Sequence, residues 1–357
     1  MKCFRTNGAS FGLAILFGLI AGTSPVEAVV VVDETDGSQI NTSAPSNDPG
    51  FESVVRVYRA AGSPDASGVY LGQGWVLTAD HVGKSDSLVE FDISGSVFSV
   101  PVIQTMEPAA GVDLELLRFD IASLGVAEAT LLSSLSPVSL SSSTAGTGAA
   151  DEFMMIGYGR SGTVTPKAYD IDTAPDPDLW SDRSVNPPDG VPEALAVQWG
   201  GAKQKQWGTN ASAGTLAISY TVEGQPTINP AILTLFDGGD PDEGQGVPGD
   251  SGGALFFDNG VNWELAGIMV AISQFDGNAL LDGAPLEDVL PALLDGQPSS
   301  SLAVYDYFGF PGSVTYSVNL SVFHDEILAI IPEPASGGLV LSGLLAFWVR
   351  RRRSGRG

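Results

Sequence analysis

Short runs of β-branched and aromatic residues alternate with clusters of Gly, Pro, Asn and Asp along most of the chain. This spacing is typical of strands joined by turns, and no helical heptad or internal repeat competes with it. We therefore expect an all-β sandwich or barrel. The predicted strands are residues 53–58, 68–78, 97–103, 114–119, 152–158, 215–221, 254–257 and 263–272.

A stretch of Ser, Thr and Gly at 141–148 is the best internal boundary, and it divides the β-rich region into two halves. We expect a leading segment at 29–50, a first half at 51–148 and a second half at 149–331. Residues 170–190 are rich in Asp and Pro, which predicts a surface loop within an insertion near 165–210.

Residues 1–28 have the layout of a secretory signal peptide. Basic residues precede an apolar stretch at 11–22, and the small residues Val26 and Ala28 suit a signal peptidase that cuts after Ala28. A membrane helix is the weaker interpretation, because a span needs about 20 apolar residues. The only cysteine is Cys3, so the exported chain would have to be stabilised by packing without disulfides.

The C-terminal 26 residues have three parts in order: Pro332-Glu333-Pro334, an apolar run at 335–349 and four arginines at 350–353. This tail resembles the PEP-CTERM sorting signal of Gram-negative bacteria, which an exosortase recognises and processes. The resemblance implies a cell-envelope or extracellular location, an exosortase-like partner and transient membrane association. A plain anchor or an amphipathic tail is the alternative.

The chain is strongly acidic, with 16 Lys and Arg against 42 Asp and Glu and a formal net charge of −26. The two terminal segments hold seven of the 16 basic residues but only two of the 42 acidic ones, so the part between them is more acidic still. Such a chain lacks the basic surface that phosphate binding requires, and we expect no nucleic-acid partner. The charge favours solubility and attracts cations or basic partners, but it does not identify a substrate.

Three short motifs carry candidate chemistry. Residues 75–81 form an apolar strand that ends in His81, one of only two histidines. Residues 111–117 place Asp113 at the start of a second apolar strand. Residues 249–253 place Ser251 in a turn rich in glycine. A serine needs a base to become nucleophilic, the base needs an acid to orient it, and the oxyanion needs backbone N–H donors. His81, Asp113 and Ser251 supply these types in that order.

These motifs resemble those of the chymotrypsin-like (trypsin-fold) serine proteases. Residues 78–81 are similar to the family's Thr-Ala-Ala-His, residues 113–116 are similar to Asp-Ile-Ala-Leu, and residues 249–253 are its Gly-Asp-Ser-Gly-Gly. The resemblance implies two antiparallel Greek-key β-barrels, at 51–148 and 149–331, with the active site in the cleft between them and a short C-terminal helix. It also implies a serine endopeptidase that acts on protein or peptide substrates and needs no cofactor.

Carried over by residue, the resemblance makes His81 the general base, Asp113 its orienting partner and Ser251 the nucleophile. The amides of Gly249 and Ser251 would form the oxyanion hole. Asp250 would pair with a freed N-terminal amine on activation, for which Ile40 is one candidate start, although the residues after it depart from the family pattern.

The substrate pocket is expected near Gln245, six residues before Ser251, and Ile272. An amide at position 245 does not support a preference for Lys or Arg, and Ile272 favours small apolar side chains. The acidic loop 237–243 offers oxygen ligands for Ca²⁺ but lacks EF-hand spacing, so a solvated loop is the preferred interpretation and no metal is expected.

Two alternatives remain. The serine motif also fits the Gly-x-Ser-x-Gly elbow of α/β hydrolases, in which His324 would be the base, but the alternating βαβ pattern of that fold is missing and His324 lies in a predicted terminal helix. The second is a catalytically inactive protease fold used for binding or adhesion at the cell surface, and Asp80, directly before His81, is its only support.

Overall fold

The computed structural model describes residues 29–31, 41–59, 66–143, 145, 151–162, 167–172, 179–183, 194–238, 240, 242–274, 302–307 and 313–331. The predicted signal peptide, Ile40 and the predicted tail at 332–357 lie outside the described residues. Among the described helices, none has the length and apolar character that a membrane crossing requires.

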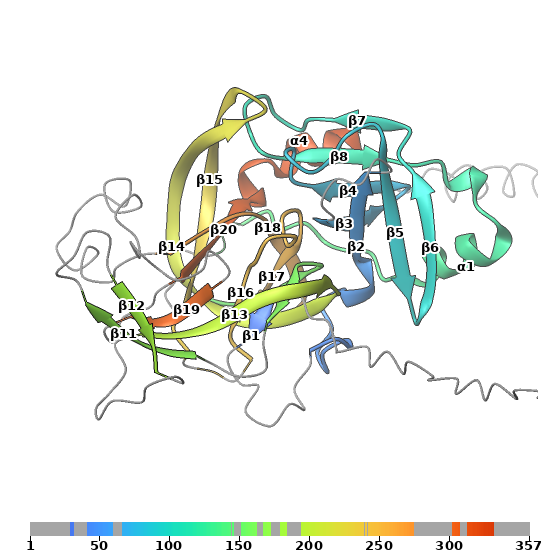
Figure 1. The fold of residues 1–357 in the computed structure, drawn as a ribbon. Coiled ribbons are helices and arrows are strands. Elements are labelled where there is room, and N and C mark those ends of the chain that lie inside the picture. The colour runs from blue at the N-terminus through green and yellow to red at the C-terminus, as the bar shows by residue number, and fades with distance from the viewer. Residues whose placement is uncertain are drawn as a thin grey trace, which may run out of the picture.

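The first half of the chain forms an antiparallel sheet of seven strands (Figure 1). Their spatial order is β6-β5-β2-β3-β4-β8-β7. The bounds are β2 Val54–Arg59, β3 Ala66–Gly72, β4 Trp75–Thr78, β5 Ser87–Ile93, β6 Ser96–Pro101, β7 Gln104–Met106 and β8 Glu115–Arg118.

Alternation of apolar and polar side chains explains how this sheet folds. In β5 every second residue is buried, which turns Val89, Phe91 and Ile93 toward the core and leaves the residues between them half-exposed. Phe91 packs edge-on against Tyr70 and Phe119, with ring centroids 5.4 and 5.5 Å apart. These aromatic pairs are the centre of the first half's own core.

The second half forms a closed barrel of six antiparallel strands in the order β14-β15-β20-β18-β17-β9. The bounds are β9 Glu152–Gly157, β14 Gln206–Val222, β15 Gln225–Phe236, β17 Ala254–Asp258, β18 Trp263–Gln274 and β20 Ser313–Asn319. With 17 and 12 residues, β14 and β15 are long enough for their hairpin to reach the first half, where the N–H of Ile228 donates to the carbonyl of Gly111 at 3.0 Å (Figure 1).

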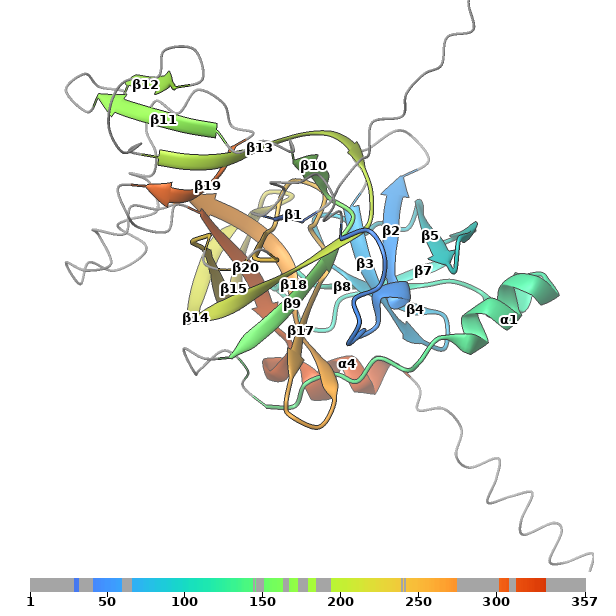
Figure 2. The same ribbon diagram turned by 90° about the horizontal axis from the view of Figure 1, so that it is seen from below.

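A smaller sheet stands at the side of the barrel away from the first half (Figure 2). Its strands are β10 Arg160–Gly162, β11 Lys167–Asp172, β12 Leu179–Asp182, β13 Ala194–Lys203 and β19 Leu302–Tyr307. The expectation of a plain surface loop at 170–190 is therefore wrong for the described residues of that range. Strand β11 pairs with both β12 and β13, and β13 in turn pairs with β19 from much later in the chain.

The remaining elements are short. They are β1 Val30–Val31, which pairs with β16 Gly244–Gln245, the 3-10 turns η1 Phe51–Ser53, η2 Ile121–Ser123 and η4 Leu320–Val322, and the helices α1 Val126–Ser134 and α4 His324–Ile330. The expected all-β fold with a short C-terminal helix is confirmed, as a half-barrel sheet beside a closed barrel.

Two buried polar side chains join the halves. Lys205, 5% exposed, lies in the barrel half and donates to the carbonyls of Phe51, Val54 and Asp92 at 3.1, 3.0 and 3.4 Å. Burial lowers the pKa of its ammonium to about 8. Ser67, on β3 and fully buried, accepts from the N–H of Tyr158 at 2.8 Å and donates to the carbonyl of Gly249 at 2.9 Å.

Replacing Ser67 by alanine should destabilise the protein without changing its fold. The Tyr158 N–H and the Gly249 carbonyl would each lose their partner in a dry environment, at about 1–3 kcal/mol per group. We expect urea denaturation to show a loss of roughly 2–5 kcal/mol in the free energy of unfolding with an unchanged m value. The matched control Ser99→Ala removes an exposed hydroxyl that contacts Tyr58, and should change stability by less than about 0.5 kcal/mol. Equal losses in the two variants would show that Ser67 does not join the halves.

Candidate active site

His81 and Asp113 meet because of the register between two strands. Thr78, at the end of β4, pairs with Glu115, at the start of β8. His81, which follows β4, therefore lies beside Asp113, which precedes β8. The Nδ1 atom of His81 lies 2.7 Å from Oδ2 of Asp113, and the backbone N–H of His81 donates to Oδ1 at 2.9 Å. Both oxygens of the carboxylate therefore hold the histidine, one through its ring and one through its backbone.

The barrel half completes the surroundings of Asp113. Tyr220, on β14, donates its hydroxyl to Oδ2 of Asp113 at 2.5 Å, and Asn229, on β15, accepts from the backbone N–H of Asp113 at 2.8 Å. The side chain of Asp113 is completely buried. Burial by itself would raise the pKa of Asp113, but the hydrogen bonds and charge of His81 and the Tyr220 hydroxyl bring it below its ordinary value. The carboxylate is thus ionised next to the imidazole.

Ser251 lies in a tight turn directly before β17, and glycines permit that turn. Gly249 and Gly252 have φ angles of +113° and +84°, a region that other residues rarely adopt. A Cβ atom on Gly252 would overlap the carbonyl oxygen of Ser67 and Oγ1 of Thr78. The serine turn therefore lies directly against Ser67 of β3 and Thr78 of β4. Thr78 is three residues before His81 in the sequence.

Backbone hydrogen bonds fix the turn against β3. The N–H of Ser67 donates to the carbonyl of Ser251 at 2.9 Å, and the Ser67 hydroxyl donates to the carbonyl of Gly249 at 2.9 Å. Within the described part of the chain, the N–H groups of Gly249 and Ser251 donate no hydrogen bond. Two fixed amides without a partner, on either side of one residue, are what an oxyanion hole requires.

Ser251 and His81 come from different halves, and the serine turn reaches the strand that ends just before His81. Over the described residues, no hydrogen bond joins the Ser251 hydroxyl to the His81 ring. Such a bond often forms only when substrate binds. The contact of Gly252 with Thr78 and the pairing of β4 with β8 bring together the segments that carry the three predicted residues.

Asp250 points away from the solvent, into the barrel. It is 1% exposed, and its Oδ2 accepts from the N–H of Val247 at 2.8 Å. Gly157 and Gly159 leave the space that its carboxylate occupies, because a Cβ atom on either would overlap the carboxylate. Burial raises the pKa of Asp250 to about 7, although the N–H groups of Val247, Gly159 and Val29 and the charge of Lys203 act in the opposite direction.

The residues predicted for the substrate pocket lie close together. Gln245 is 2% exposed, and its amide donates to the carbonyls of Gly246 and Val314 at 3.1 and 3.2 Å. Ile272, on β18, is 41% exposed, and a Cβ atom on Gly246 would lie 3.4 Å from its Cγ2. Ile272 therefore stands beside the Gln245–Gly246 segment.

Asp80, directly before His81, lies in a group of charged side chains. Lys84 contacts it at 3.5 Å, and its carboxylate lies within 4.8 Å of those of Glu107 and Glu115. Burial raises the pKa of Glu115 to about 7, and the hydrogen bond and charge of Asp80 add to that. Asp80 therefore lies in a small group of carboxylates beside the strand that begins at Glu115.

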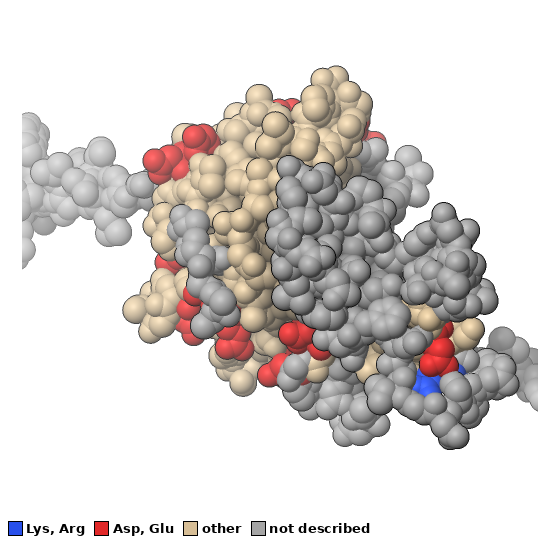
Figure 3. All heavy atoms as spheres, turned by 90° about the vertical axis from the view of Figure 1, so that its left-hand side faces the viewer, with Lys and Arg blue, Asp and Glu red and all other residues tan. Residues whose placement is uncertain are grey.

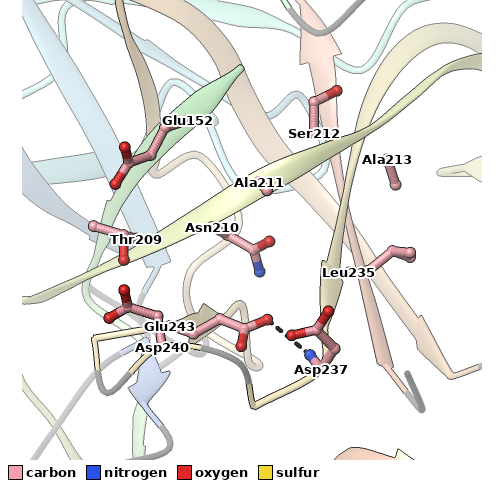
Figure 4. Close-up of a pocket in the computed structure, with 10 residues that line it drawn as sticks. All are labelled: Glu152, Thr209, Asn210, Ala211, Ser212, Ala213, Leu235, Asp237, Asp240 and Glu243. Atoms are coloured by element: carbon pink, nitrogen blue, oxygen red, sulfur yellow. Dashed lines mark hydrogen bonds between the residues drawn. The ribbon is translucent and has the colours of Figure 1, made fainter. Parts of the chain in front are cut away.

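A cavity of about 560 Å³ lies on the barrel, away from His81 and Ser251 (Figure 4). Its acidic lining residues are Glu152, Asp237, Asp240 and Glu243, and Glu243 accepts from the N–H of Asp237 at 2.7 Å. These four carboxylates are not gathered within 4.8 Å as the Asp80 group is. On one face of the molecule the described atoms show several groups of Asp and Glu and little Lys or Arg (Figure 3), in line with the acidic composition.

His324 is at the start of α4, and its ring contacts the neighbouring Asp325 at 2.9 Å. In the described part of the chain it has no hydrogen bond to Asp113 or Ser251. The sequence analysis missed Ser67, Tyr220 and Asn229, which hold the other residues in place. None of them lies in a recognisable motif, and Tyr220 is 107 positions from the carboxylate that it contacts.

The Trypsin family model matches residues 40–174. The matched segment includes β2 to β9 with His81 and Asp113, and it ends before Ser251. A comparison with curated proteins finds no match.

The solved structures that are similar to this chain include the following two. One is a serine-to-alanine mutant of Rv3671c from M. tuberculosis H37Rv in its inactive form, with 14% identity, a TM-score of 0.39 and coverage of 82% of this chain and 98% of that chain. The other is neuropsin, a serine protease expressed in the limbic system of mouse brain, with 17% identity, a TM-score of 0.42 and the same two coverages. Both likenesses are too distant to support an inference about activity. The segment that carries His81 and Asp113 is, by the family match, similar to the Trypsin family.

Proposed function

We propose that this chain is a serine endopeptidase that hydrolyses peptide bonds through Ser251, His81 and Asp113. The observation that supports the proposal most strongly is the buried Asp113 carboxylate on Nδ1 of His81, beside a serine turn whose two amides have no partner among the described residues. The Trypsin match over residues 40–174 points to the same chemistry.

In this proposal Asp113 holds the tautomer of His81 that carries its proton on Nδ1, so Nε2 is free to take a proton. The Ser251 hydroxyl attacks the carbonyl carbon of the scissile bond and gives its proton to Nε2. The carbonyl oxygen becomes an oxyanion that the amides of Gly249 and Ser251 stabilise. His81 then protonates the leaving amine, the C–N bond breaks and an acyl group remains on Ser251. Water attacks this ester by the same steps and restores the serine.

We also propose that the protein is exported, through the signal peptide at 1–28, to the envelope or the exterior of a Gram-negative cell. The tail at 332–357 would be processed by an exosortase-like enzyme after a transient stay in the membrane. The tripartite order of each segment supports these assignments.

Fluorophosphonate labelling of the full chain tests the reaction. We expect Ser251→Ala to abolish labelling and His81→Ala to slow it by at least roughly 10⁴-fold, because the triad acts as a unit. The matched control His324→Ala, which changes the only other histidine, should label like the wild type. A need for His324 instead of His81 would favour the esterase. A folded wild type that never labels would favour the inactive binding module.

Tyr220→Phe tests whether the barrel half sets the ionisation of Asp113. Loss of the hydroxyl removes a donor that lowers the pKa of Asp113, so the carboxyl should take up its proton at a higher pH. As the solution is acidified, we expect Tyr220→Phe to lose labelling at a higher pH than the wild type does. At pH 8 its labelling rate should be about tenfold lower than that of the wild type. The matched control Tyr58→Phe removes a hydroxyl that contacts only Ser99 in the first half. An unchanged pH profile in Tyr220→Phe would mean that His81 alone governs Asp113.

We propose that the pocket near Gln245 and Ile272 takes small apolar side chains. Ile272→Ala should admit larger apolar residues before the cut, with a gain of about tenfold in kcat/KM for Leu over Ala in a peptide library, since each methylene contributes about 1–3 kcal/mol. Exposed Val261, on the β17–β18 turn, is the matched control, and Val261→Ala should leave the profile unchanged. An unchanged profile in Ile272→Ala would place the pocket elsewhere.

A further inference from the structure

The turn that carries His81 packs directly against Glu115. The N–H of Gly83 donates to the carbonyl of Ala79 at 3.1 Å, which closes residues 79–83 into a tight turn. A Cβ atom on Gly83 would lie 3.2 Å from Cγ of Glu115, which is closer than ordinary contact. Glu115 itself is only 5% exposed. The turn therefore cannot move without changing the surroundings of the Glu115 side chain.

Glu115 shares this buried position with other carboxyl groups. Asp80 lies in the same turn, directly before His81, and one carboxylate oxygen each of Asp80, Glu107 and Glu115 lie within 4.8 Å of one another. Among the described residues, no Lys or Arg forms an ion pair with Glu115. Two carboxyl groups this close, in a site with little water, are stabilised when one of them keeps its proton and donates it to the other.

Glu115 is the member of the pair better placed to keep the proton. It is the more buried of the two, since the side chain of Asp80 is 21% exposed and is also contacted by Lys84. Burial raises the pKa of Glu115 to about 7, and the hydrogen bond and charge of Asp80 are the next causes. The charge of Glu107 acts in the same direction, and a hydrogen bond with Thr105 acts against it. Glu115 therefore gives up its proton near neutral pH.

Lys84 divides its charge between two carboxylates from different halves. Its Nζ lies 3.1 Å from Oε1 of Glu223, at the turn between β14 and β15, and 3.5 Å from Oδ1 of Asp80. Burial alone would lower the pKa of Lys84, but the hydrogen bond with Glu223 and the charges of both carboxylates raise it. Lys84 is thus a cation throughout the pH range in which Glu115 titrates.

The position of the turn determines both contacts between His81 and Asp113. Nδ1 of His81 lies 2.7 Å from Oδ2 of Asp113, and the backbone N–H of His81 donates to Oδ1 at 2.9 Å. An ionised Glu115 repels Asp80, the residue directly before His81. This repulsion pushes the turn away from β8 and lengthens both contacts.

We propose that Glu115 is a positioning residue for His81: its protonated carboxyl donates a hydrogen bond to Asp80 and holds the turn, and loss of this proton releases the turn and slows the reaction. The inference rests on the proposed function for its effect on catalysis. It adds an alkaline limit that the triad alone does not have, because the attack by Ser251 requires no group of the triad to gain a proton first.

The test follows the rate of fluorophosphonate labelling of the full chain from about pH 6 to about pH 9. We expect the wild-type rate to fall about tenfold as the pH rises above about 7, because a misplaced base is a poor catalyst. Glu115→Gln should label without this fall, since its amide donates to Asp80 at every pH. Glu115→Ala, which makes no such hydrogen bond, should label about tenfold more slowly than the wild type already at pH 7.

The matched control is Glu90→Gln, which changes a glutamate of the same sheet that pairs with Arg56, and it should keep the alkaline fall. A wild-type rate that stays level above pH 7 would overturn the proposal. So would a fall in Glu115→Gln equal to that of the wild type.

Two further variants should move the alkaline fall in opposite directions. Lys84→Met removes a positive charge and favours the protonated pair, so the fall should occur at a higher pH than in the wild type. Glu107→Gln removes a negative charge that raises the pKa of Glu115, so the fall should occur at a lower pH. Disappearance of the fall in Lys84→Met would identify Lys84 as the titrating group and would also overturn the proposal.

A second measurement does not need a reactive serine. In a chain that carries His324→Ala, His81 is the only histidine. Proton NMR then reports the Nδ1 proton of His81, which resonates far downfield while it is bonded to a carboxylate. We expect this signal to disappear above about pH 7, and to persist to about one pH unit higher when Glu115→Gln is added.

The two measurements separate the two proposals. If neither chain labels but the signal depends on Glu115 in this way, the proposed function fails and the positioning role holds. If the signal has the same pH dependence with and without Glu115→Gln, the positioning role itself is wrong.

Discussion

The burial of the Asp113 carboxylate is the constraint on which the arrangement of the two halves depends. A carboxylate without water must receive its hydrogen bonds from the protein, and a lone buried charge is costly. His81 supplies two of these bonds from the first half, and Tyr220 supplies the third from the barrel. The long β14–β15 hairpin reaches the first half and brings this third donor to Asp113.

The serine turn depends on the opposite kind of constraint, which is the absence of side-chain atoms. Gly252 allows the turn to touch Ser67 and Thr78, and Gly157 and Gly159 allow Asp250 to enter the barrel. The missing Cβ of Gly252 brings the serine turn into contact with the backbone of Ser67, and Ser67 then joins Gly249 to Tyr158 by hydrogen bonds. The geometry of the site and the contact between the two halves thus depend on the same few residues.

Much of the fold could be predicted from the sequence, because strand alternation and the residues at turns are local properties. The predicted strand at 152–158 is close to β9, and the one at 263–272 is close to β18. The sequence does not predict β5 in spite of its regular alternation. Of the 17 residues of β14 it predicts only 215–221, because the first part of the strand is rich in Gly, Ser and Ala and has few β-forming residues. The small sheet at 160–203 was hidden because its partner β19 lies about a hundred residues further along the chain.

The site divides in the same way. His81, Asp113 and Ser251 lie in motifs, so their types and order could be found in the sequence, and the structure brings the first two into contact. Tyr220 and Asn229 occupy ordinary positions on long strands, and their role appears only when the hairpin crosses to the other half. The burial of Val29 and Val31 could not be predicted, because it depends on Gly244 and Gly208, which lie far from them in sequence.

The ammonium of Lys205 belongs to the barrel half and donates to three carbonyls of the first half. This contact affects how well the folded protein resists proteolysis. No described residue is a cysteine, so no disulfide among them restrains a partly opened chain. Buried polar groups and a shared apolar core join the two halves. Local opening therefore exposes polar groups without partners, and its free energy is close to that of global unfolding. The two halves then unfold as one cooperative unit, and an attacking protease finds few partly open states to cut.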